Sequence, residues 1–196
     1  MSMEKTSKES DKEVCLKKGN EYYFGKNVSK DLSAAASYYK RAAELGSAMA
    51  KARLGEMYYK GYGVGINLGI AKKYLKEAAD MKCTYALYVL GSMCYAGDYG
   101  FLAGKGKAFE FWKRAAKLGH PASQYMIACS YMGDEWGEEM SYKKAAYWFM
   151  CAYQNREAGK EVIDKAKIYL NKLSNQVNLD SVKSEIINVH PEYLNL

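Results

Sequence analysis

Apolar residues recur along the middle of the chain with the spacing of an amphipathic helix. Ala50, Leu54 and Tyr58 follow one another at intervals of four residues, which places them on one stripe of a helix of 3.6 residues per turn. A glycine-rich stretch covers 61–65, and a second apolar stripe follows it, made of Ala71, Tyr74, Leu75, Ala78 and Ala79. The pattern predicts two short helices that pair as a hairpin and bury these stripes.

This hairpin pattern returns every 36 or 37 residues. A glycine marks the same place in three successive first helices, at Gly19, Gly55 and Gly91. It follows Leu54 and Leu90 in the second and third units, and in the fourth unit Ile127-Ala128 takes the place of Leu-Gly. The second helices carry paired alanines with the same period, at Ala42-Ala43, Ala78-Ala79 and Ala115-Ala116. A fixed period of this size is typical of stacked helical repeats, which usually bind macromolecules and rarely catalyse reactions.

Residues at the expected helix ends agree with the repeat. Gly61 and Gly97 end first helices, because glycine accepts the left-handed backbone that a helix C-terminus commonly needs. The second helices are predicted to begin after residue types that serve as N-caps, namely Asp31, Asn67, Gly104 and Ser141. Gly55 and Gly91 stand in mid-helix at a cost of about 1 kcal/mol each, which predicts the close approach of another backbone there. Aromatic residues fill the remaining space, with Tyr22, Tyr58 and Tyr131 in one buried row and Phe111 and Trp112 buried in the third unit.

These residues resemble the Sel1-like repeat, a relative of the tetratricopeptide repeat. The run from Ala50 to Val64 matches its pattern A-x-x-x-L-G-x-x-Y-x-x-G-x-G-V at every marked position, and the similarity covers about 15–155. The fourth unit departs at Ala128 and in the connector 134–141. The resemblance implies an all-α fold, a right-handed α/α superhelix of four repeats at about 13–46, 47–82, 83–119 and 120–155.

The two ends of the chain fall outside the repeats. We interpret 1–12 as a flexible N-terminus, and 156–196 as a C-terminal cap and tail. Helical spacing predicts a closing helix over 160–173, since solenoids cover their exposed ends. A second short helix over 180–189 either packs on the array or forms a detachable tail with its own partner. The N-terminus has no apolar core of the kind that a signal peptide needs. The sequence also has no run of 18 apolar residues, the length that a membrane-spanning helix requires. We therefore expect a cytoplasmic protein, and we expect it to be a monomer.

A further row of side chains lies on the first helices, on a face separate from the buried stripe. In Sel1-like and tetratricopeptide arrays the first helices line the concave side, so the resemblance places this row in the groove. Aromatic side chains there would grip a partner with large contact area. The alternative is that they pack the tight inner curve between helices. The predicted partner-binding residues are Tyr23, Glu56, Tyr59, Tyr88, Ser92, Tyr95, Tyr125 and Met132.

The net charge of +7 favours an acidic partner at long range. The lysines and arginines spread over the second helices, however, which indicates a solvated outer face, and no nucleic-acid-binding module is visible. An acidic cluster over 134–139 does not have the spacing of an EF-hand loop and is interpreted as a solvated loop.

Candidate chemistry is sparse. Neither His120 nor His190 has a glutamate or cysteine at a metal-ligand spacing, and the five cysteines form no CxxC pair. The glycine-rich connectors lack the phosphate-loop pattern. The sequence therefore predicts no catalysis, no cofactor and no metal. We expect a protein-interaction scaffold that binds a protein or peptide; the alternative, also drawn from the family resemblance, is a bacterial immunity protein that neutralises a toxin by direct binding.

Overall fold

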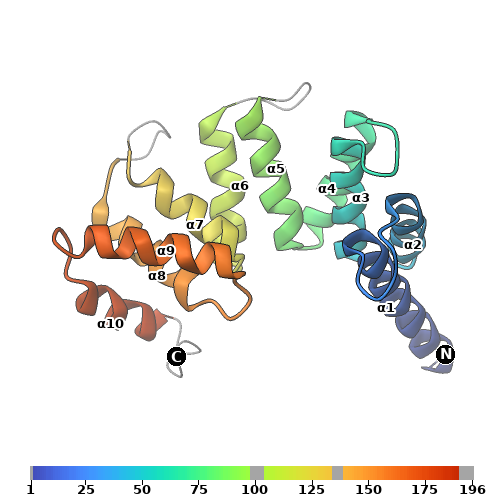
Figure 1. Ribbon diagram of the computed structural model, residues 1–196, viewed down its shortest axis with the longest axis horizontal. Coiled ribbons are helices and arrows are strands. Elements are labelled where there is room, and N and C mark those ends of the chain that lie inside the picture. The colour runs from blue at the N-terminus through green and yellow to red at the C-terminus, as the bar shows by residue number, and fades with distance from the viewer. Residues whose placement is uncertain (1, 98–103, 134–138, 190–196) are drawn as a thin grey trace. The chain divides into compact units, whose positions relative to one another are not determined.

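The computed structural model describes residues 2–97, 104–133 and 139–189, and within them the chain is helical without a strand (Figure 1). Ten helices are present there. Their bounds are α1 (Ser2–Phe24), α2 (Leu32–Glu44), α3 (Ala48–Lys60), α4 (Leu68–Asp80), α5 (Thr84–Ala96), α6 (Lys105–Lys117), α7 (Pro121–Ser130), α8 (Tyr142–Gln154), α9 (Lys160–Leu173) and α10 (Leu179–Val189). The all-α solenoid class predicted from the sequence is confirmed.

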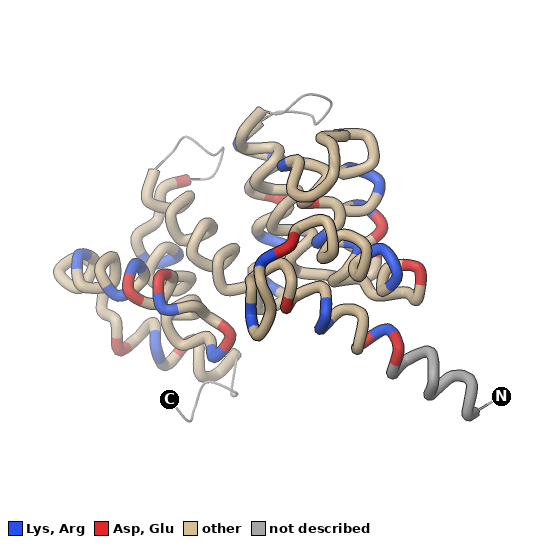
Figure 2. The backbone as a smooth tube through the Cα atoms, turned by 45° about the vertical axis from the view of Figure 1, so that its right-hand side comes forward, with Lys and Arg blue, Asp and Glu red and all other residues tan. Residues whose placement is uncertain are grey.

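The chain forms two compact units that divide within α5, between Leu90 and Gly91. In the first unit, α1 pairs with α2 and α3 pairs with α4, while α2 also packs on α3. In the second unit, α6 packs on α7, α7 on α8, α8 on α9, and α10 on α8. In each unit, basic and acidic residues are distributed over several helices (Figure 2).

Capping residues fix where the second helices begin. Oδ1 of Asp31 accepts hydrogen bonds from the backbone N–H groups of Ser33 and Ala34, both at 2.9 Å. Asn67 caps α4 and Ser141 caps α8 through the N–H three residues on, at 2.9 and 3.3 Å, and Gly104 precedes α6 without a side-chain cap. All four predicted starts are confirmed. So are the two glycine ends, because Gly61 and Gly97 adopt the left-handed backbone with φ of 72° and 74°.

Each of the glycines that recur in the first helices faces one large side chain of the second helix in the same repeat. A Cβ on Gly19 would lie 2.6 Å from the Tyr39 ring, and one on Gly91 would lie 2.5 Å from the Trp112 ring. A Cβ on Gly55 would lie 2.6 Å from Cγ of Leu75 and 3.1 Å from the carbonyl oxygen of Ala71. The close approach predicted from the sequence is confirmed, but a side chain makes the nearest contact at all three glycines, and a backbone atom is among the three nearest atoms only at Gly55.

Aromatic pairs close the hairpins at a second recurring place. Tyr22 stacks on Tyr38 with centroids 5.6 Å apart, and one period later Tyr58 stacks on Tyr74 at 6.1 Å. The expectation that Tyr22, Tyr58 and Tyr131 are buried is wrong for the first two, which are half-buried because their partners on the second helix also lie near the surface. Tyr131 is buried.

The second helix of the third repeat, α6, differs from its predicted burial pattern at two aromatic residues. Trp112, Ala115 and Ala116 are buried as expected, whereas Phe111 is only half-buried and Phe109 is buried in addition. Phe109 makes an edge contact with Tyr131 of the next first helix, at 5.8 Å between centroids. It therefore joins two successive repeats of the second unit.

Helices also form outside the repeats, within the described residues. The first helix begins at Ser2, whereas the sequence assigned 1–12 to a flexible segment; its charged residues lack an apolar stripe, so the pattern gave no signal for a helix. The predicted closing helix over 160–173 is α9. The second short helix is α10, which packs on α8 and buries Val182 and Ile186, so the packed alternative is confirmed for that helix. Residues 98–103, 134–138 and 190–196, which include most of the third connector and of the acidic cluster, lie outside the described residues. In the part of the chain that is described, no helix is long and apolar enough to cross a membrane.

Candidate functional site

The predicted row on the first helices divides between the two units. In the first unit it comprises Tyr23 on α1, Glu56 and Tyr59 on α3, and Tyr88 on α5. The three tyrosines are half-buried, whereas Glu56 is 6% exposed. A carboxylate buried to this degree is costly unless it is paired, so the contacts of Glu56 define the site.

Glu56 is paired on both of its oxygens. Oε1 accepts a hydrogen bond from Nζ of Lys60 at 2.8 Å. Oε2 accepts from the Tyr85 hydroxyl and lies 3.3 Å from Nη1 of Arg53. Nη1 of Arg53 also donates to the Tyr85 hydroxyl oxygen at 2.7 Å. We call Arg53, Glu56, Lys60 and Tyr85 the charged cluster; it contains two cations and one carboxylate, so it keeps one positive charge.

Aromatic rings surround the Arg53 guanidinium. Its Cζ lies 4.2 Å from the centre of the Tyr85 ring and 5.5 Å from the centres of both Tyr23 and Phe24. Its Nε is buried and has no hydrogen-bond partner among the described residues. Rings at these distances attract a cation through their electron-rich faces. Tyr23 and Phe24 of α1 therefore attract the side chain of Arg53, which belongs to α3.

The electrostatics of the cluster favour the charged forms. Burial alone raises the pKa of Glu56, but hydrogen bonds from Lys60 and Tyr85 and the charges of Lys60 and Arg53 outweigh it, and the pKa is lowered. Burial lowers the pKa of Lys60, and its bond to Glu56 more than reverses this, so that pKa is raised. Burial, with Glu56 nearby, raises the pKa of the Tyr85 hydroxyl. Near neutral pH the cluster therefore keeps its ion pairs and its phenolic proton.

Exposed aromatic surface borders the charged cluster. Phe24 is 51% exposed and Tyr62 is 40% exposed. The ammonium of Lys60, whose side chain is 42% exposed, lies 5.5 Å from the centre of the Tyr62 ring. We call Tyr23, Phe24, Tyr59, Lys60 and Tyr62 the first-helix face. It presents aromatic rings around the positive charge of Lys60, which Glu56 holds in place.

In the second unit the row has a different character. Tyr95 is 51% exposed, and its ring lies 5.7 Å from that of Trp112. Tyr125 packs edge-on against Phe149 at 5.6 Å and against Tyr169 of α9 at 6.2 Å. The closing helix α9 therefore partly covers Tyr125, and burial raises the pKa of its hydroxyl. Ser92 and Met132 are half-exposed. Among the row residues of the second unit, Tyr95 is the most exposed to solvent.

The sequence analysis named Tyr23, Glu56 and Tyr59 of this site. It missed the other residues of the charged cluster and of the first-helix face, which are Arg53, Lys60, Tyr85, Phe24 and Tyr62. One signal was available, because Glu56 and Lys60 have the i, i+4 spacing and order that favour an ion pair on a helix. The Tyr85 contact joins neighbouring first helices. It depends on how far one hairpin is displaced along the next, and the repeat period does not give this displacement.

His120, which the sequence analysis considered as a metal ligand, has a structural role. Nδ1 of His120 accepts a hydrogen bond from the N–H of Ser123 at 3.2 Å and so caps α7, a role that the sequence reading had not given it. Across residues 2–97, 104–133 and 139–189, no three His, Cys, Asp or Glu side chains gather closely enough to hold a metal ion.

Comparison with known proteins places these hairpins in a family. Repeated helical hairpins make the chain an α/α-solenoid protein. The Sel1 repeat model matches residues 15–47, 48–83, 84–120 and 121–155, within two residues of the boundaries read from the sequence, so the chain belongs to the Sel1 repeat family. Sel1 repeat proteins generally mediate protein–protein interactions and are typically non-catalytic scaffolds.

Two solved structures resemble the chain. A Sel1 repeat protein from Oxalobacter formigenes has 25% identity and a TM-score of 0.69 over 83% of this chain. A protective antigen from uropathogenic Escherichia coli with an SLR fold has 23% identity and a TM-score of 0.60, again over 83% of this chain, and supports the fold alone. The chain spans 63% and 38% of the lengths of these two proteins. No curated protein matches it.

Proposed function

We propose that this protein is a non-catalytic scaffold that binds a protein or peptide through the first-helix face. The observation that carries the proposal is the charged cluster beneath that face. Arg53 and Lys60 are held in fixed positions by Glu56 and Tyr85, so they can meet a partner's charge with little loss of side-chain entropy. Phe24 and Tyr62 supply exposed aromatic area beside them.

The charge of the face points to an acidic partner. The cluster retains one positive charge after Glu56 is neutralised, and the whole chain carries +7. A carboxylate of the partner would reach the half-exposed Lys60 side chain, and an apolar side chain next to it would pack on Phe24 or Tyr62. Long-range attraction from the net charge would also speed the encounter.

The test is quantitative affinity capture from a lysate of the native cell, with three forms of the purified protein. The double variant Phe24→Ala/Tyr62→Ala removes exposed rings of the first-helix face. Tyr153→Ala is the matched control, because Tyr153 is also 40% exposed but lies on α8. We expect a protein that wild type and control recover equally and that the double variant recovers about tenfold less, a loss of about 1.4 kcal/mol.

Equal recovery by all three forms would overturn the proposal, and so would a loss of recovery in the double variant that is fully accounted for by a fall in its helical content. The double variant Tyr59→Ala/Tyr95→Ala separates binding from packing in the predicted row. Unchanged affinity with lower stability would assign these two tyrosines to packing. A captured toxin encoded beside the gene would identify the scaffold as an immunity protein.

A further inference from the structure

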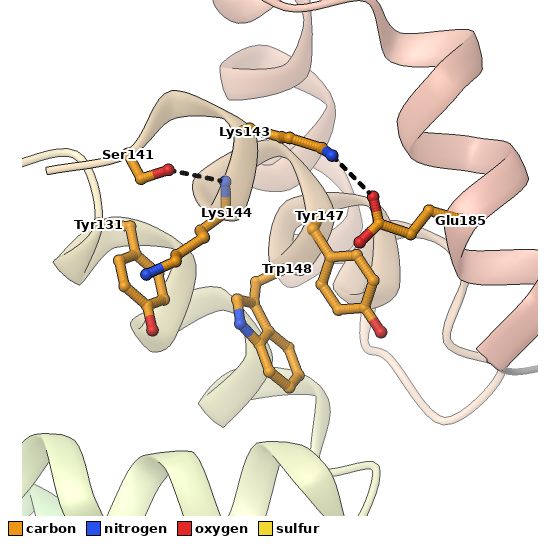
Figure 3. A pocket seen from close by; sticks show the side chains of 7 residues that line it. All are labelled: Tyr131, Ser141, Lys143, Lys144, Tyr147, Trp148 and Glu185. Atoms are coloured by element: carbon orange, nitrogen blue, oxygen red, sulfur yellow. Dashed lines mark hydrogen bonds and ion pairs between the residues drawn. The ribbon is translucent and has the colours of Figure 1, made fainter.

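The second unit contains a pocket that shares no residue with the first-helix face. It has a volume of about 380 Å³ and is lined mainly by one side of α8, with Tyr131 at the end of α7 and Glu185 on α10 (Figure 3). Pockets of about 300–1,000 Å³ commonly hold small ligands or one or two side chains of a partner. Six of its seven lining residues lie within the fourth Sel1 repeat, and none of the seven belongs to the first-helix face.

Aromatic rings form the apolar part of the pocket. Tyr147 and Trp148 project from α8 and meet edge to face, with their centroids 5.3 Å apart. In Figure 3 the rings of Tyr131, Trp148 and Tyr147 lie next to one another along the same side of α8. Tyr131 is buried, whereas the other two are half-buried and accessible. The rings offer a surface on which an aromatic or aliphatic side chain can stack.

The pocket also carries one cation that no described carboxylate neutralises. Lys143 and Glu185 form an ion pair at 3.1 Å, so their charges cancel. The ammonium of Lys144 lies 5.1 Å from the centre of the Tyr131 ring, and no carboxylate among residues 2–97, 104–133 and 139–189 is within ion-pair distance of it. The net charge of the lining is therefore +1, with the excess charge beside the aromatic rings.

We propose that this pocket binds an acidic peptide segment of a partner, with a carboxylate on Lys144 and a neighbouring aromatic or aliphatic side chain against Trp148 and Tyr147. Charge complementarity selects the carboxylate, because Glu185 already satisfies Lys143 and Lys144 keeps its charge. The rings select the apolar neighbour. A basic segment would meet Lys144 with the same charge and is disfavoured.

The experiment follows the indole N–H signal of Trp148 in two-dimensional NMR spectra of the full chain, assigned with Trp148→Phe. The probes are the peptides acetyl-Glu-Phe-Glu-amide, acetyl-Gln-Phe-Gln-amide and acetyl-Lys-Phe-Lys-amide. We expect the acidic peptide to shift the signal saturably, and the neutral and basic peptides to bind at least about tenfold more weakly, as the loss of one charge-assisted contact would produce.

Protein variants test the residue that carries the proposal. Lys144→Gln is expected to weaken the acidic peptide about tenfold and to leave the neutral peptide unchanged. Lys167→Gln, an exposed lysine on α9, is the matched control and should bind as wild type does. These reagents leave the first-helix face intact, so the outcome does not depend on the proposed function.

Three outcomes would overturn the proposal. The acidic peptide could give no saturable shift, Lys144→Gln could bind it as tightly as wild type, or the basic peptide could bind best, which would assign recognition to Glu185. A saturable shift by tri-N-acetylchitotriose with none by the acidic peptide would assign the pocket to a carbohydrate and would equally reject the peptide.

Discussion

At the scale of single residues, the glycines of the first helices and the buried Glu56 show opposite uses of a helix surface. Glycine removes a side chain so that one large residue of the second helix can enter, at Tyr39, Leu75 and Trp112 in turn. Glu56 instead adds a charge to a buried position and depends on its partners for compensation. Both choices make the local structure sensitive to one substitution.

The close packing around Gly55 predicts that a larger residue there lowers the stability of the protein. Gly55→Ala places a Cβ 2.6 Å from Cγ of Leu75, and overpacking of this kind should lower the free energy of unfolding by about 1–3 kcal/mol. Gly106→Ala in the first turn of α6 meets nothing within 4 Å and should raise it by up to about 1 kcal/mol, because alanine favours helix. Urea denaturation of both variants measures the difference. Equal effects at the two sites would contradict the packing described here.

Removal of the Glu56 charge should be costly. Glu56→Gln leaves Arg53 and Lys60 without their carboxylate and should destabilise the protein by about 1–3 kcal/mol near neutral pH. Glu77→Gln removes a partly exposed ion pair with Lys51 and should cost less, about 1 kcal/mol or below. Since the pKa of Glu56 is lowered on folding, its contribution is complete above the unfolded pKa and is lost as the pH falls through the folded pKa. The gap between wild type and Glu56→Gln should therefore narrow in acid, and a gap that widened there would reject the assignment.

At the scale of elements, helix boundaries follow from their caps, and α7 differs from the other first helices at its start. Ser47 caps α3 with its hydroxyl, whereas His120 caps α7 with a neutral ring nitrogen. Burial lowers the pKa of His120 to about 4. Protonation would remove the lone pair that accepts the N–H of Ser123, so this cap depends on pH.

The His120 cap predicts a pH dependence of stability. The unfolded histidine takes up a proton near pH 6.5 and the folded one near pH 4, so stability is complete above about 6.5 and declines as the pH falls between these values. The total decline from this residue should be up to about 3 kcal/mol. His120→Asn keeps a capping oxygen but does not titrate, so its stability should fall less over the same range. Parallel curves for wild type and variant in thermal melts from pH 4 to 7 would exclude the cap as the cause.

The sequence was most informative about the individual helices and where they begin and end. The period, the four second-helix starts and the glycine ends follow from local residue types, and all of them are confirmed because caps and left-handed turns depend on a few neighbouring residues. The reading failed where a contact joins separate elements. Three features depend on how two helices meet, which the spacing within one helix does not encode. They are the burial of Phe109 instead of Phe111, the Tyr22–Tyr38 stack and the Arg53–Tyr85 hydrogen bond. Of the candidate site, the sequence named the carboxylate but not the groups that hold it.

At the scale of the whole molecule, the chain consists of two compact units, and stability in repeat proteins is built from neighbouring contacts. In repeat proteins generally, each repeat buries its apolar face against its neighbour, so a defect should spread only as far as these contacts carry it. The second unit ends in α10, which covers part of α8 with Val182 and Ile186. This end is the clearest place to test how local the stability is.

Ile186→Ala should loosen the second unit and leave the start of the first unit unchanged. Ile186 is fully buried, so truncation should cost about 2–4 kcal/mol of local stability, whereas Val189→Ala at a 60% exposed position should cost less than about 0.5 kcal/mol. Hydrogen exchange resolves the location: amides of α8, α9 and α10 should exchange faster in Ile186→Ala, while those of α2 and α3 should keep their wild-type rates. If α2 and α3 accelerated as much as α8, the chain would unfold as one cooperative body, and the repeat-by-repeat account of its stability would be wrong.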